Sequence, residues 1–315
     1  MYGVDGDNLS RQYKRHISGF GEWAWRDVAE AYVLFEKNLG PRLSIDETCL
    51  SQDEVYTVVT NKDAHGRKGS LVAMVRGTRA DDVATVLRKM SAGLRSRVRE
   101  ITLDLSPSMK QIAKRAFPCA IQVSDRFHVQ QLMGEAVEDL RIRHRWEAID
   151  QENAEIQMTR EAGRAFRSHV LANGETRRQL LARSKRLLVI HPAKWTDTQK
   201  ARADVLFRLY PDLKTAYDRY LELVDIYNTR DRPRPVLMTR LARWYERVRQ
   251  MHLKSFNTVL ETFTNNYVTI LNYFDNRSTN ASAESFNAKV KAFRLQFRGV
   301  TDIPFFIFRL ATLFA

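Results

Sequence analysis

The period of the apolar residues changes twice along this chain of 315 residues, and these changes limit the folds open to it. From residue 43 to about 125, short alternating runs are interleaved with helical patterns. From about 130 to 270, apolar residues recur only every three or four positions, as in amphipathic helices. We therefore expect an α/β fold, a mixed sheet with flanking helices, followed by a large α-helical module.

The first half of the chain predicts the order of strands and helices. Residues 43–50, 54–61 and 70–77 form three alternating runs with short links, which indicates an antiparallel meander. A helical stripe over residues 80–94 follows, then a β-branched run over residues 100–105. Ser106-Pro107 predicts the start of the next helix, because serine caps free N–H groups and proline fits the first helical position. Residues 120–125 are the last predicted strand.

The rest of the chain is predicted to be helical. Residues 1–40 are amphipathic, and Gly40-Pro41 ends that pattern. The tail carries one polar helix and then a strongly apolar one, with a break at Gly299. We expect four regions: an N-terminal helical segment (1–42), the first part of the sheet domain (43–135), an α-helical insertion (136–272) and the last part of the sheet domain (273–315).

The charge of the chain indicates a polyanionic partner. Lys and Arg number 51 against 37 Asp and Glu, a net charge of +14. The positive charge gathers near residues 177–186, 230–249 and 289–298, which is typical of a track for nucleic-acid phosphates. The residues expected to contact DNA are Arg126, Arg240, Arg243, Arg247, Lys289, Lys291 and Arg294.

Other classes of protein are disfavoured by the composition. Cys49 and Cys119 are the two cysteines, which excludes a zinc ribbon within this chain and suggests reduced thiols. The sequence has no apolar run long enough for a membrane span and no signal peptide at Met1. We expect a cytoplasmic, nucleoid-associated protein without a membrane partner.

Acidic residues end two successive predicted strands, Asp104 at one and Asp125 at the other. Asp46 lies within the first strand, and becomes a neighbour of Asp104 if the two strands pair in parallel. Two such carboxylates repel unless a cation lies between them, and Mg²⁺ or Mn²⁺ favours carboxylate oxygens. Two ions roughly 3.5–4 Å apart would activate a water or a 3′-hydroxyl at a phosphodiester.

Glu284 is the candidate for a third metal-binding carboxylate. It opens a predicted helix, with Asn280 and Asn287 on the same face and Lys291 continuing it. These residues also have ordinary structural interpretations. An aspartate at a strand end commonly caps a turn, and a glutamate in a first helical turn compensates the helix dipole.

Four blocks of sequence together resemble the DDE transposases of bacterial insertion sequences, and most closely the ISL-three family, which is related to Mutator-like transposases. The blocks are SIDETCL, LDLSPSM, DRFHVQQL and TNASAESFNAKVKAFR, and the resemblance covers residues 43–315. It implies an RNase H-like core with a helical insertion. It also implies a transposase that uses two Mg²⁺ or Mn²⁺ ions to cleave DNA and transfer strands, with Asp46 and Glu284 among the catalytic metal ligands.

The second catalytic aspartate has two candidates. Topology favours Asp104, since it ends the fourth predicted strand. Asp125 and His128 resemble the accessory Cys-or-Asp-x-x-His motif of the Mutator-like relatives, which follows one strand later. In the alternative assignment Asp125 binds the metal and Asp104 supports it. A lone histidine such as His128 is more commonly a hydrogen-bonded core residue.

The resemblance also bears on partners. It implies DNA as substrate, both element ends and target, and a homodimer that holds two ends together. Family members usually carry an N-terminal zinc-binding helix-turn-helix region, which this sequence lacks, so we expect it on another polypeptide or lost by truncation. Two alternative functions remain open: an RNase H-like nuclease without strand joining, and a catalytically inactive DNA-binding transposase remnant.

Overall fold

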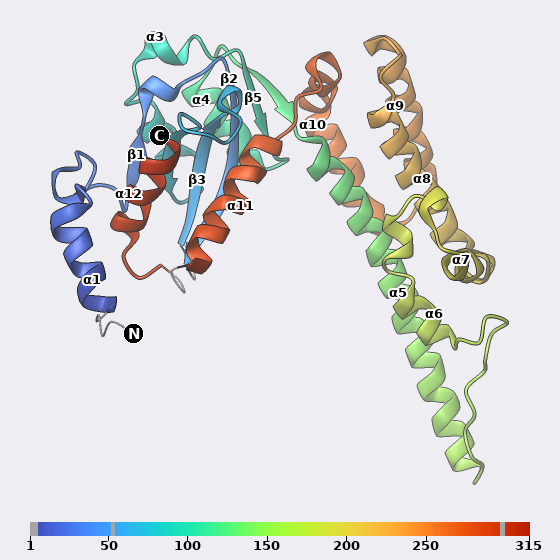
Figure 1. The fold of residues 1–315 in the computed structure, drawn as a ribbon. Coiled ribbons are helices and arrows are strands. Elements are labelled where there is room, and N and C mark those ends of the chain that lie inside the picture. The colour runs from blue at the N-terminus through green and yellow to red at the C-terminus, as the bar shows by residue number, and fades with distance from the viewer. Residues whose placement is uncertain (1–5, 52–53, 297–299) are drawn as a thin grey trace. The chain divides into compact units, whose positions relative to one another are not determined.

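The computed structural model describes residues 6–51, 54–296 and 300–315. Its contacts divide the chain into two compact units. The first unit, Met1–Asp125 with Val268–Ala315, holds the sheet, and the second, Arg126–Tyr267, is helical (Figure 1).

The sheet unit is built on six strands in the order β1-β4-β3-β2-β5-β6. β2, β3 and β4 form the predicted antiparallel meander, and β1 pairs antiparallel with the outer side of β4. β5 and β6 pair in parallel beyond β2, because each is reached through a helical connection. The strands are β1 (Tyr32–Leu34), β2 (Arg42–Ser51), β3 (Glu54–Asn61), β4 (Leu71–Arg76), β5 (Glu100–Leu103) and β6 (Ile121–Ser124).

One face of the sheet is covered by α2 (Ala80–Leu87) and α4 (Pro107–Ala116), with the short α3 (Ala92–Arg95) following α2. Alternate residues of β2 and β5 point to this face and are fully buried, among them Ile45 and Ile101. α4 begins at Pro107 as the sequence predicts. The burial of aliphatic side chains on this face stabilises the sheet.

The opposite face is covered by α11 (Ala281–Gln296) and α12 (Ile303–Phe314), which lie in front of it in Figure 1. Phe286 of α11 and Ile307 of α12 pack with Tyr56 and Val58 of β3 in a second core. This arrangement confirms the predicted α/β fold class, a mixed sheet with flanking helices that is interrupted by a large helical insertion.

The N-terminal segment differs from the helix predicted over residues 1–40. Residues 1–5 lie outside the described residues, α1 covers Gly6–Gln12, and Gly19 then takes a left-handed φ of 75°. Tyr32 to Leu34 form an edge strand instead of a helix. The reason is tertiary: the backbone of this segment completes hydrogen bonds along β4, which local periodicity does not show.

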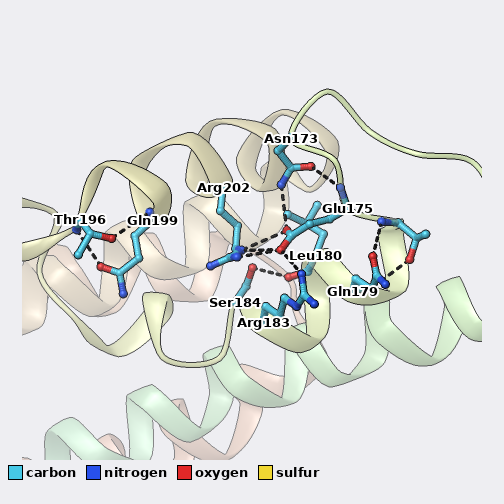
Figure 2. Close-up of polar contacts among 10 residues, drawn as sticks. Asn173, Glu175, Gln179, Leu180, Arg183, Ser184, Thr196, Gln199 and Arg202 are labelled. Carbon is cyan, nitrogen blue, oxygen red and sulfur yellow. Dashed lines mark hydrogen bonds and ion pairs between the residues drawn. The ribbon is translucent and has the colours of Figure 1, made fainter.

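The helical unit starts directly after β6. Its helices are α5 (Arg126–Glu161), α6 (Arg177–Arg183), α7 (Asp197–Leu209), α8 (Pro211–Asn228), α9 (Arg234–Gln250) and α10 (Asn257–Asn276), which runs on into the sheet unit. Thr176 and Thr196 form capping boxes at the starts of α6 and α7. Figure 2 shows the box that Thr196 forms with Gln199. Among all described residues, no helix has the length and apolar character that crossing a membrane requires.

Candidate active site

Three aspartates occupy equivalent places on three neighbouring parallel strands. The register pairs Ser44 of β2 with Thr102 of β5, and Thr102 with Val123 of β6. Two residues further along each strand lie Asp46, Asp104 and Asp125. Since side chains alternate along a strand, these carboxylates belong to the same face as their paired residues. The parallel pairing expected between the strands of Asp46 and Asp104 is therefore present.

Hydrogen bonds join α11, the helix that carries Glu284, to both ends of the row of aspartates. The backbone N–H of Asn280, just before α11, donates to Asp125 Oδ1 at 3.2 Å. Asn287 Nδ2 donates to Asp46 Oδ2 at 2.7 Å and to the Glu47 carbonyl at 3.2 Å. From 280 to 287 a helix advances about 10.5 Å, which matches two strand spacings of about 4.8 Å each.

Glu284 lies between these two anchors along α11. It is four residues after Asn280 and three before Asn287, at the solvent edge of the stripe that faces the sheet. Asn280 and Asn287 are buried, whereas Glu284 is exposed. The backbone of α11 thus brings Glu284 to the row of aspartates while its side chain reaches solvent.

Negative charge is crowded at this edge of the sheet. Partial burial raises the pKa of Glu47, and the nearby carboxylates of Asp104 and Asp46 raise it further. Asp104 Oδ1 accepts a hydrogen bond from the Ser106 N–H at 2.9 Å, which ties it to the start of α4. Carboxylates gathered in this way favour the binding of a proton or a cation.

Several buried polar atoms beside the row lack a hydrogen-bond partner among the described residues. They are Asp125 Oδ2, Asn287 Oδ1 and both side-chain polar atoms of Asn280. Buried polar oxygens are normally hydrogen-bonded, so unpaired ones indicate a site for water or an ion. Carboxylate and amide oxygens are the donors that Mg²⁺ and Mn²⁺ prefer. The donor set therefore fits a hard divalent cation.

The three predicted carboxylates nevertheless do not converge on one point. Over the described ranges, no three His, Cys, Asp or Glu side chains lie close enough together to hold a metal ion. Asp46 and Asp104 share the row, and Glu284 has an exposed position on α11, between the two residues that contact the ends of the row.

Comparison with known proteins identifies the family. A model of the ISL-three type of DDE transposases, described as "Transposase", matches residues 43–310. The chain belongs to this transposase family. The chain is also similar to the solved "Drosophila P element transposase strand transfer complex", at 13% sequence identity and a TM-score of 0.40, over 98% of this chain and 84% of that one. A search of curated proteins gives no match.

The two candidates for the second catalytic aspartate of this transposase have different surroundings. Asp125 is 1% exposed and one of its oxygens accepts the N–H of Asn280. Asp104 is partly exposed, and its charge acts on Glu47. His128 lies on the first turn of α5, in the helical unit, with its ring edge-on to Phe127.

The basic residues expected to contact DNA fall into two groups. Arg240 is paired with Asp225 at 2.7 Å, Arg247 is paired with Glu222, and Arg126 donates to Asn228, all within the helical unit. On α11, Lys289 Nζ donates to the Gly66 carbonyl at 2.6 Å and Arg294 to the Cys49 carbonyl at 3.2 Å. Arg243 and Lys291 are exposed, and Arg298 of the third cluster lies outside the described residues.

Sequence reasoning missed the part played by Glu47, Lys62 and Glu100. Glu47 directly follows Asp46, and adjacent acids on a strand give no periodic signal because they point to opposite faces. Lys62 and Glu100 lie at strand ends, where exposed charges are ordinary. Their pairing depends on the register between β2, β3 and β5, which the sequence alone does not state.

Proposed function

We propose that this transposase cleaves DNA strands by metal-dependent hydrolysis and joins 3′ ends to target DNA by transesterification. The observation that carries the proposal is the parallel register of β2, β5 and β6, which puts Asp46 and Asp104 side by side. α11 adds Glu284, because Asn280, just before the helix, and Asn287 on it contact opposite ends of the row of aspartates. We propose these three carboxylates as the catalytic residues.

Asp46, Asp104 and Glu284 would hold two Mg²⁺ or Mn²⁺ ions. When bound, such ions activate a water or a 3′-hydroxyl and stabilise the leaving oxygen of a phosphodiester. The chain's own amide groups orient the ligands. Asn287 holds Asp46 by its amide N–H, and the Ser106 N–H holds Asp104. Rotation of the Glu284 side chain toward the row would complete the ligand set.

We assign the second ligand to Asp104 and an accessory role to Asp125 and His128. Asp125 is buried beneath the start of α11 and already accepts a backbone hydrogen bond there. A residue in that position supports the helix that carries Glu284. Asp104 has the partial exposure that a ligand facing substrate requires.

DNA is the proposed substrate, both element ends and target. The net charge of +14 favours a polyanion, and Lys289, Lys291 and Arg294 continue from Glu284 along α11. Arg243 adds an exposed cation on α9 of the helical unit. We also propose a homodimer, because joining two element ends requires both to be held at once.

The test is cleavage of DNA in the presence of Mn²⁺ by single variants. Asp46→Asn, Asp104→Asn and Glu284→Gln each should lower the rate by roughly 10³-fold, because each removes a ligand of the proposed ions, whose charge would stabilise the transition state by several kcal/mol. DNA affinity should persist. Asp82→Asn, at an exposed position on α2, is the matched control. Normal cleavage by all three variants would reject the assignment.

A second assay separates a transposase from a nuclease. DNA with pre-cut ends is supplied together with a target duplex, and joined products are measured. Joining is expected with the unaltered chain and absent with Asp104→Asn. Cleavage without joining would support the alternative of an RNase H-like nuclease.

A further inference from the structure

The segment that leads into α11 is fastened to the sheet by a small polar cluster. Asn276, the last residue of α10, donates to Glu100 Oε2 at 3.0 Å, and the hydroxyl of Ser278 donates to the other oxygen of Glu100. Lys62 Nζ donates to Thr102 Oγ1 at 2.7 Å and also to Ser278. Residues from the turn after β3, from β5 and from the α10–α11 segment therefore meet here.

The centre of this cluster is a buried ion pair. Lys62 Nζ lies 3.5 Å from Glu100 Oε1, and the two side chains are 13% and 6% exposed. Burial lowers the pKa of Lys62, and the charge of Glu100 acts against this. Removing two charges from water costs free energy that their attraction often fails to recover. Such a pair adds little to the free energy of unfolding. It does hold the side chains of Lys62 and Glu100 in one arrangement, because both form several hydrogen bonds.

The backbone between the fastened residues is strained. Arg277 lies between Asn276 and Ser278 and has a left-handed φ of 55°. A non-glycine residue in that region costs roughly 1 kcal/mol or more and persists where its surroundings enforce it. The guanidinium of Arg277 also rests over the rings of Tyr273 and Phe274, at 5.7 and 5.4 Å.

This turn sets the direction in which α11 leaves the sheet. Ser278 is two residues before Asn280, whose N–H meets Asp125, and Glu284 follows in the first turn of the helix. We propose that Lys62, Glu100 and Ser278 form a clamp that fixes the start of α11 and thereby positions Glu284 for metal binding. They are positioning residues, and the inference rests on the proposed function of Glu284.

The main test is the double variant Lys62→Met/Glu100→Met. Removing both charges leaves no buried charge unpaired, so the fold should survive, as checked by circular dichroism and thermal unfolding. The dissociation constant of Mn²⁺, measured by calorimetry with MnCl₂ on the full chain, should rise about tenfold or more, as for other residues that support metal ligands. Amide hydrogen exchange over residues 281–287 should become faster.

Matched variants separate positioning from general stability. Ser278→Ala should raise the Mn²⁺ dissociation constant, whereas Ser278→Thr, which keeps a hydroxyl, should restore it. Arg115→Met/Asp81→Met removes an exposed ion pair between α4 and α2 of the same unit and should leave Mn²⁺ binding and α11 exchange unchanged.

Two results would overturn the clamp. One is an unchanged Mn²⁺ dissociation constant and unchanged exchange in the folded Met double variant. The other is an equal effect of Ser278→Ala and Ser278→Thr. The proposed function fails separately, when Asp46→Asn, Asp104→Asn and Glu284→Gln still cleave DNA, so the two failures are distinguishable.

Discussion

Two acidic side chains of this transposase, one in each unit, have opposite surroundings. In the helical unit Glu175 is buried and surrounded by donors: Arg202, Arg183 and Asn173 all bond to its carboxylate (Figure 2). Hydrogen bonds from Arg202 hold the pKa of Glu175 below its usual range. In the sheet unit, Glu47 has its pKa raised by burial and by the acids beside it.

This contrast separates an acid whose charge is balanced by neighbouring donors from one whose charge is opposed by neighbouring acids. The donors around Glu175 join the segment before α6 to α7, and they satisfy its charge within the protein. The acids near Asp46 repel one another, so a cation bound at this sheet edge, as we propose, would stabilise it. Removing an acid should therefore lower the free energy of unfolding at the Glu175 cluster and raise it at the acids near Asp46.

The largest expected effect on stability comes from Glu175→Gln. It leaves the buried end of Arg202 without its ionic partner, so the free energy of unfolding by urea should fall by about 2 kcal/mol at pH 7. Glu246→Gln, which removes a surface pair with Arg249, is the control and should change nothing measurable. An equal loss in both variants would contradict a special role for the buried cluster.

The same variant predicts a pH dependence. Because the pKa of Glu175 is lower in the folded state, its stabilisation is complete above the ordinary value of 4.5 and is lost as the pH falls through the folded pKa. The difference between the unaltered chain and Glu175→Gln should therefore shrink below about pH 4.5 in urea titrations. A constant difference down to pH 2 would argue against ionic stabilisation.

An intermediate effect, on activity, is expected from Asn287→Ala. This change removes the N–H that holds Asp46, and should lower Mn²⁺-dependent cleavage by about 10–100-fold. Gln296→Ala, at an exposed position on the same helix, is the matched control. Full activity in Asn287→Ala would show that Asp46 needs no such support.

The smallest effect is expected from Glu47→Gln, and it has the opposite sign to Glu175→Gln. Ionised Glu47 is unfavourable in the folded state, so the variant should have a higher Tm at pH 7 without metal. The gain should shrink as the pH falls through the raised pKa and disappear below the ordinary value of 4.5. Adding Mn²⁺ should also reduce this gain in Tm. A lower Tm at pH 7 would contradict the charge crowding.

The sequence by itself predicted much of this transposase. Alternating runs predicted β2 to β4, and the Ser106-Pro107 pair predicted the start of α4. The 3.6-residue periodicity predicted the helical unit. These features are local, because side-chain alternation and capping depend on neighbours in the chain. The parallel strands at Asp104 and Asp125 were also predicted, since strand–helix–strand units pair in parallel.

Only the tertiary structure decided how the site is assembled. Edge strand β1, the contact of Asn287 with Asp46, and the Lys62–Glu100 pair join residues far apart in the chain. The crowding of Glu47 by Asp104 likewise depends on strand register. Local sequence patterns determine the face of the sheet or helix on which a side chain lies, whereas long-range strand pairing determines which residues lie beside it. Electrostatic interactions and hydrogen bonds depend on those neighbours, so they could not be predicted from local patterns.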